Sequence, residues 1–174
     1  EAAYAMTTGA DCVIIGYGSS ATHTGTVHDI VAIGSRALQS NTTGVDIVAI
    51  GKLALGANTT GVNSTAVGYE ALLSNTTADN NIGIGFRALK GNETGTRNIA
   101  IGSNANDQTT DEDDNLAIGI DAMTANVAGG EKNVGIGNYA LDALTSADDS
   151  TAVGYQALTG MTSGTSCTAL GSSA

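Results

Sequence analysis

The sequence predicts an all-β protein, a parallel β-solenoid (β-roll) of about ten coils of 17 residues. Three observations carry this prediction. An aliphatic residue followed by glycine recurs at a fixed spacing, a short strand pattern precedes each glycine, and polar corners separate the copies. Self-similarity at a fixed period is typical of architectures in which one small unit stacks on the next.

The glycines define the repeat, with successive spacings of 17 or 18 residues. They are Gly16, Gly34, Gly51, Gly68, Gly85, Gly102, Gly119, Gly137, Gly154 and Gly171. A helical repeat needs about 33 or more residues per unit. Two or three glycines per copy also disfavour a helix. The unit must therefore consist of strands and turns.

The three residues before each glycine predict a short strand. In Thr65-Ala66-Val67 a small residue lies between two β-branched residues, and the other copies follow the same period of two. One face of the strands is therefore β-branched, and the other carries only small residues. Because a small face lets something large approach closely, another copy of the chain is the natural candidate to pack on it, and the interior of the coil is the alternative.

An alanine-leucine pair follows most of the strands, as in Ala71-Leu72, with Ala122-Met123 as a variant, and it predicts a second short strand or a tight turn that closes the coil. A polar corner comes next, best seen as Asn-Thr-Thr-Gly at residues 41–44. Asparagine and glycine favour turns. No linker interrupts the pattern, so we expect one solenoid domain at residues 12–174 after a lead-in segment at residues 1–11.

The composition limits the function classes. The net charge is -11, with one phenylalanine and no tryptophan. Nucleic acids and anionic membranes need a basic face, so neither is expected as a partner. No apolar run approaches the roughly 18 residues of a membrane span. The cluster of charged groups beside an aromatic groove that an enzyme needs is not visible. We expect a non-catalytic protein without a cofactor.

In-register stacking places like residues above like. Four residues before the glycine, consecutive copies carry asparagine, which predicts a structural ladder hydrogen-bonded along the stack. These residues are Asn81, Asn98, Asn115 and Asn133. Recognition of a ligand is the alternative role for them.

Five Asn-x-Thr sequons make candidate N-glycosylation sites, most of them at the corners. They begin at Asn41, Asn58, Asn63, Asn75 and Asn92. The alternative is that asparagine and threonine are simply good corner residues. The same corners align pairs of threonines at residues 42–43, 59–60 and 76–77, a weaker candidate for an ice-binding face.

Two polar segments are candidates for metal binding. Clustered carboxylates such as those at residues 111–114 can hold Ca²⁺, but the spacing matches no calcium-binding repeat, so we expect a solvated acidic loop. His23 and His28 lie in the irregular first loop. No cysteine or carboxylate cluster accompanies them at ligand spacing, so we expect exposed loop residues and no metal site.

The two cysteines occupy the same repeat position in the first and last coils. Nine coils keep Cys12 and Cys167 about 43 Å apart within a chain, far beyond the roughly 7 Å limit for a disulfide. Chains stacked head to tail would bring the two positions together, so they are candidates for an intermolecular disulfide. The alternative is a pair of small buried thiols.

Several copies carry a family resemblance. The segments Asn-Ser-Thr-Ala-Val-Gly at 63–68, Asn-Ile-Ala-Ile-Gly at 98–102 and Asn-Leu-Ala-Ile-Gly at 115–119 resemble the head repeats of trimeric autotransporter adhesins (YadA-like). Residues 151–158 resemble repeats of phage tail-fibre proteins. The resemblance implies a left-handed parallel β-roll whose chains wrap into a homotrimer. The period here is longer than in those head repeats.

The resemblance implies a structural and adhesive module of an extracellular or viral fibre, located outside the cell, at the cell surface or in a virion fibre. Its partners would be copies of itself and a host surface receptor or glycan, in cell adhesion. The alternative is a subunit of a self-assembling extracellular filament, joined head to tail by stacked solenoid ends.

Overall fold

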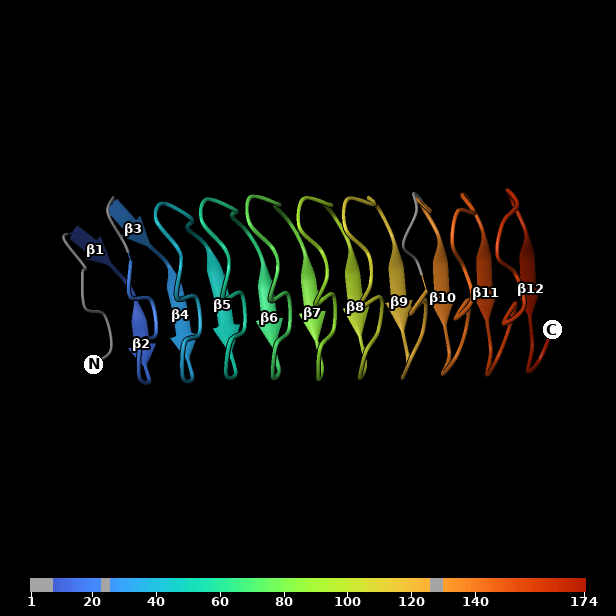
Figure 1. Cartoon of the computed structure of the whole chain (residues 1–174), viewed down its shortest axis with the longest axis horizontal. Helices are drawn as coiled ribbons and strands as arrows, with labels where there is room; N and C mark the ends of the chain where they lie inside the picture. Colours follow the sequence, from blue (N-terminus) through green and yellow to red (C-terminus); the bar gives the residue numbers. More distant parts are fainter. Residues whose placement is uncertain (1–7, 23–25, 126–129) are drawn as a thin grey trace.

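The chain folds into short strands joined by turns (Figure 1). The computed structural model describes residues 8–22, 26–125 and 130–174, and these ranges contain no helix. The strands are β1 (Thr8–Ala10), β2 (Val13–Ile15), β3 (Thr26–His28), β4 (Ile30–Ile33), β5 (Ile47–Ile50), β6 (Thr65–Val67), β7 (Ile82–Ile84), β8 (Ile99–Ile101), β9 (Leu116–Ile118), β10 (Val134–Ile136), β11 (Thr151–Val153) and β12 (Thr168–Leu170).

Ten of the strands form one parallel sheet in chain order, from β2 and β4 to β12, while β1 pairs separately with β3. Partners lie one repeat apart: Thr65 pairs with Ile82, and Ile82 pairs with Ile99. Each strand therefore reaches its neighbour after one full coil. The predicted parallel β-solenoid with coils of about 17 residues is confirmed.

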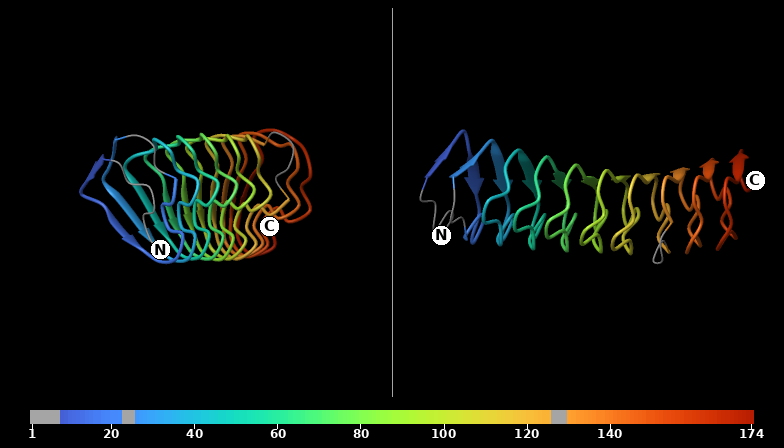
Figure 2. Two further views of the ribbon diagram at one scale, coloured as in Figure 1. Left: turned by 60° about the vertical axis from the view of Figure 1, so that its left-hand side comes forward. Right: turned by 90° about the horizontal axis from the view of Figure 1, so that it is seen from above.

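The sheet occupies one side of a rod. Figure 2 shows its strands along one side and the turns along the other, with β2 and β12 at opposite ends of the rod. The lead-in segment expected at residues 1–11 includes β1, whose Gly9 pairs with Val27 of β3. Stacking between coils therefore begins before the first strand of the large sheet.

The small face of the strands points into the coil. Ala66 and Ala100 are fully buried, while their neighbours in the strand remain partly exposed. A side chain added at Gly83 would meet the Leu72 side chain at 3.2 Å. The large group that packs on the small face is thus the leucine of the same chain. The expectation that another copy packs there is wrong.

The alanine-leucine pair forms a tight turn, and no strand is assigned to it in the described residues. Leu72 has a φ of 51°, and its N–H donates to the carbonyl of Ala88 in the next coil at 3.0 Å. This left-handed conformation costs roughly 1–2 kcal/mol. Because it turns the leucine into the interior, the burial of about 1.5–3 kcal/mol per leucine offsets that cost.

The glycine of each repeat lets neighbouring coils approach closely. Gly119 has a φ of 139°, and a Cβ there would lie 2.5 Å from the carbonyl oxygen of Gly137. Real side chains cannot occupy such a position, so the glycine period follows directly from the stacking of backbones.

Candidate interaction surface

An aliphatic face runs along the outside of the sheet. The first and last positions of the three-residue strand pattern point outward, and across the regular coils they carry mainly isoleucine, valine and leucine. We call this set the outer aliphatic face. It comprises Val31, Ile33, Val48, Ile50, Thr65, Val67, Ile82, Ile84, Ile99, Ile101, Leu116, Ile118, Val134, Ile136, Thr151 and Val153.

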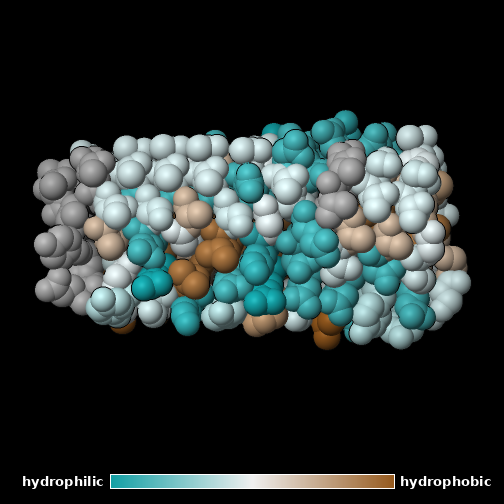
Figure 3. Space-filling model, viewed as in Figure 1, coloured by the Kyte–Doolittle hydropathy of each residue, from teal (hydrophilic) through white to brown (hydrophobic). Residues whose placement is uncertain are grey.

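This face is partly open to solvent: most of its members are partly buried, and Ile84 and Ile101 are exposed. Ile84 and Ile101 keep 37% and 38% of their surface exposed, even though coils cover them on both sides. In the view of Figure 3 the surface is mostly hydrophilic or neutral with a few hydrophobic spots. A contiguous exposed apolar surface of this kind marks an interaction site in soluble proteins.

A short aromatic row follows the sheet at the next position along the coil. The Tyr69 and Phe86 rings stack with centroids 5.5 Å apart and an interplanar angle of 11°. Lys52 lies 5.8 Å from the Tyr69 ring, and Arg87 lies 4.9 Å from the Phe86 ring. The aromatic row therefore continues the apolar surface, and Lys52 and Arg87 form a cationic rim beside it.

Glu70 neutralises part of that rim. Its carboxylate accepts from Arg87 at 2.9 Å and lies 3.3 Å from Lys90. Burial acts to raise the pKa of Glu70, but hydrogen bonds from Tyr69, Lys90 and Arg87 outweigh it and hold the pKa below its usual value. Arg87 and Lys90 are thus paired with Glu70, while Lys52 lies over the Tyr69 ring.

The strand asparagines, Asn81, Asn98, Asn115 and Asn133, are buried one above another. The side-chain oxygen of Asn81 accepts from the backbone N–H of Asn98 at 2.9 Å, and the pattern continues up to Ser150. Each side-chain amide also donates to a backbone carbonyl, as from Asn98 to Glu112 at 2.6 Å. These contacts use the side chains within the stack and leave no surface for a ligand.

The corner asparagines are also interior, which argues against the candidate glycan sites there and favours the alternative of structural corner residues. Their exposure is 0–1%. The members are Asn41, Asn58, Asn75 and Asn92. From Asn58 onward, each amide nitrogen donates to the side-chain oxygen of the asparagine before it, at 2.9–3.1 Å. The amide of Asn41 donates to the carbonyl of Gly44 at 2.9 Å. Because a glycan is attached at this same nitrogen, the folded coil has no room for one. The sequon at Asn63 differs, since that side chain is exposed.

The threonines of the corners are divided between two roles. Thr42 and Thr59 donate their hydroxyls to backbone carbonyls of the next coil at 2.8 and 2.9 Å. Thr43 and Thr60 are exposed. The row of outward hydroxyls is interrupted by Asp111 in the same column.

The acidic loop at residues 111–114 is only partly solvated, so the expectation for Glu112 is wrong. Glu112 is 1% exposed, and its carboxylate accepts from the Thr109 hydroxyl at 2.5 Å and from the Thr110 N–H at 2.6 Å. This carboxylate caps the corner at which Thr109 replaces asparagine, because it also accepts from the N–H of Asp111 at 3.0 Å. Asp114 is paired with Arg97 at 2.6 Å, and this hydrogen bond lowers the pKa of Asp114.

The cysteines lie at opposite ends of the large sheet. Cys12 precedes β2 and Cys167 precedes β12, both are partly exposed, and no disulfide joins them. Their equivalent positions one residue before the two edge strands agree with the repeat alignment. An intermolecular bridge stays a prediction.

His28 has carboxylate neighbours that spacing along the chain did not reveal, which corrects the expectation of an isolated histidine. Its ring lies close to Asp29 and Asp46. His23 lies outside the described residues. None of the described ranges holds a helix long and apolar enough to cross a membrane.

Compared with known proteins, the chain matches no protein-family model, no curated protein and no solved structure. The case for a function therefore depends on the geometry of the chain itself.

Proposed function

We propose that this chain is a non-catalytic structural and adhesive module of an extracellular or viral fibre, and that it assembles with copies of itself through the outer aliphatic face. The observation that carries the proposal is the orientation of the strands. Small residues such as Ala100 fill the interior, while larger ones such as Ile101 face outward on every regular coil.

Self-association explains this orientation physically. Covering an exposed isoleucine contributes up to about 1.5–3 kcal/mol, and a face that repeats coil by coil adds such contacts along the whole rod. A second copy presents an equally long face with the same repeat. The resemblance to trimeric adhesin head repeats favours three chains, with a host receptor or glycan bound elsewhere on the assembled surface.

Analytical ultracentrifugation of charged variants tests the proposal. We expect the unmodified chain to sediment as an oligomer and Ile84→Asp/Ile101→Asp to sediment as a folded monomer, with circular dichroism reporting the fold. The matched control is Thr43→Asp/Thr60→Asp, which places the same charges on exposed corners of the rod. A monomeric unmodified chain at high concentration would remove the proposal.

The alternative is a subunit of an extracellular filament joined end to end. The equivalent positions of Cys12 and Cys167 beside the two edge strands favour it. Native material would then show a ladder of covalent multimers on non-reducing gels that collapses on reduction. Identical gels with and without reductant would argue against the bridge.

A further inference from the structure

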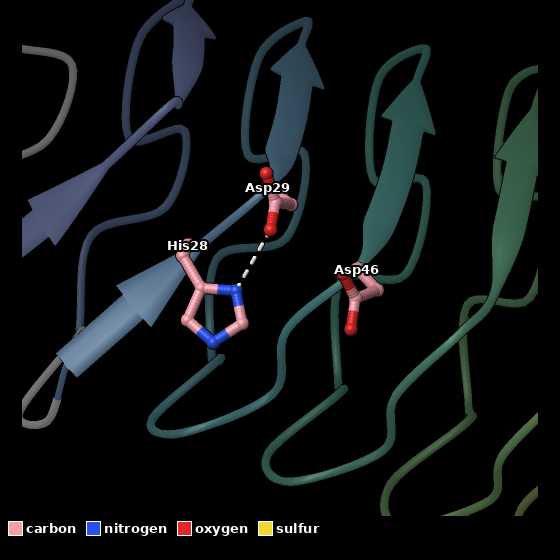
Figure 4. Close-up of side chains that lie close together, drawn as sticks. All are labelled: His28, Asp29 and Asp46. Carbon is pink, nitrogen blue, oxygen red and sulfur yellow. Dashed lines mark hydrogen bonds and ion pairs between the residues drawn. The ribbon is translucent and has the colours of Figure 1, made fainter.

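An imidazole and two carboxylates meet at one corner of the solenoid. His28 ends β3, Asp29 lies between β3 and β4, and Asp46 directly precedes β5 (Figure 4). Nδ1 of His28 lies 2.9 Å from Oδ2 of Asp29. One ligand atom from each residue lies within 4.8 Å of the others, a grouping of metal-ligand side chains that occurs once among the described residues.

The backbone holds these side chains in place. Asp29 and Asp46 occupy the same repeat position in consecutive coils and share the left-handed conformation, with φ of 55° and 57°. The N–H of Asp46 donates to the carbonyl of His28 at 3.4 Å, and the N–H of Ile47 donates to that of Asp29 at 3.2 Å. The two carboxylates are therefore stacked by the solenoid itself.

The repeat position of Asp29 and Asp46 forms a column along the rod, and the charge of its residues changes from coil to coil. In its later coils the same repeat position alternates in sign, through Arg97, Asp114, Lys132 and Asp149, and Arg97 pairs with Asp114 at 2.6 Å. In the first three coils it carries only aspartates, Asp11, Asp29 and Asp46. Stacked like charges destabilise a sheet. Within the described ranges, His28 is the one ion-pairing partner of this acidic stretch.

Other carboxylates of the chain are paired with lysine or arginine side chains. Glu70 has Arg87 and Lys90, and Asp113 and Asp114 have Arg97. Within the described residues the corner at His28 has no lysine or arginine partner, and it offers one imidazole nitrogen beside two carboxylates. That donor set is suited to an external cation.

We propose that His28, Asp29 and Asp46 bind a divalent transition-metal ion of the Zn²⁺ type. Zinc accepts both imidazole nitrogen and carboxylate oxygen at about 2.0–2.2 Å in tetrahedral geometry, so adjacent ligand atoms on one ion lie roughly 3.3–3.6 Å apart. His28 and Asp29 lie 2.9 Å apart, so a shift of a few tenths of an ångström brings this pair to the required separation. Small rotations of the half-exposed side chains bring in Asp46, and water completes the coordination.

The donor set distinguishes between cations. Ca²⁺ prefers six to eight oxygen ligands, and three side chains that include an imidazole cannot supply them. Imidazole favours zinc and related transition metals. An ion held here would connect β3 and its following residue to the next coil, and so would fasten the irregular first loop to the regular stack.

Isothermal titration of the purified chain with Zn²⁺ tests the site. We expect one ion per chain. His28→Ala and Asp46→Asn should each weaken binding at least about tenfold. Asp149→Asn is the matched control, because Asp149 is exposed at the same repeat position with φ of 54° but has no histidine beside it. Zinc should also raise the melting temperature of the unmodified chain, and a chelator should reverse the rise.

The possible outcomes separate cleanly. Absence of binding, or equal binding by the unmodified chain and both site variants, overturns the assignment. Equal affinity for Ca²⁺ and Zn²⁺ that survives His28→Ala would mean general attraction of cations to acidic corners, and also overturns it. The metal site is independent of self-assembly, so sedimentation of the metal-free variants should match that of the unmodified chain.

Discussion

Single residues decide how closely the coils of this rod can stack. Each regular coil uses one glycine at a φ of 130–141° and three further residues at φ near 50–60°. The glycine is needed because the next backbone lies against its α-carbon. The other three positions tolerate aspartate, leucine or arginine, since their side chains point away from the neighbouring backbone. Glycine is therefore strict in the repeat, while the other turn positions vary.

The glycine column gives a sharp mutational test. Gly119→Ala should lower the free energy of unfolding by about 3 kcal/mol or more, because it combines a strained φ with a backbone overlap. Gly160→Ala is the control, since no atom lies within 4 Å of a Cβ at Gly160. Chemical denaturation measures both. Similar losses for the two variants would show that the column is not what sets the coil spacing.

At the scale of one coil, the segment from Gly102 to Ile118 departs most from the repeat. Asn106 replaces the interior leucine and is fully buried, with neither side-chain polar atom hydrogen-bonded to the protein. The side-chain oxygen of Asn92 is also left without a protein partner, because Thr109 stands where the next corner asparagine would donate to it. Leaving a buried polar group unpaired costs about 1–3 kcal/mol, so this coil is the weakest layer of the stack.

Asp107, in the same coil, makes that weakness depend on pH. Burial, followed by the nearby charge of Asp121, raises the pKa of Asp107. A carboxyl whose pKa is higher folded than unfolded loses stability as pH rises from its unfolded value through the folded value. Asp107→Asn should therefore raise the melting temperature at pH 7 by roughly 1–2 °C.

The gain from Asp107→Asn should shrink as the pH is lowered toward 4, where the native carboxyl also becomes neutral. Differential scanning calorimetry across this range measures the effect. The control is Asp111→Asn, which removes an exposed carboxylate from the same coil. A gain that is independent of pH, or equal in both variants, would mean that the charge of Asp107 is not the cause.

The strands could be predicted from sequence because the period of the glycines and the alternation before them are local. The sequence could not predict which face of the strand lies inside the coil, because alternation alone does not distinguish the two faces. That choice is made by Leu72 and its equivalents, whose left-handed turn directs them against the small residues. The burial of Asn75 could have been predicted from the sequence. Asparagines that recur at one repeat position stack and hydrogen-bond along the rod, and this argument, applied above to Asn98, holds equally for the corner asparagines.

The cluster at His28 shows a different limit. Asp46 lies one coil away, and the first loop breaks the regular spacing, so no motif along the chain joins the three residues. Their proximity follows only from the register of β4 with β5, in which Ile30 pairs with Ile47. One feature of the sequence could have indicated this cluster: Asp11, Asp29 and Asp46 occupy the same repeat position in three consecutive coils.

At the scale of the whole molecule, the strands turn their small residues inward against the buried leucines and place larger aliphatic residues along one outer face. A monomer gains no stability from that arrangement beyond what neighbouring coils bury. An assembly that covers the face gains from every coil. The outer aliphatic face is therefore the feature that most directly relates this fold to a structural role.

Cysteine cross-linking tests this claim most directly. The native thiols are first removed as Cys12→Ser/Cys167→Ser, a change with precedent at the same repeat position in Ser64 and Ser150. Ile101→Cys is then added on the outer face, or Thr60→Cys at an exposed corner, and each protein is oxidised. We predict covalent dimers for Ile101→Cys and none for Thr60→Cys. Absence of cross-links at Ile101→Cys, or equal yields at both positions, would contradict an assembly built on the outer aliphatic face.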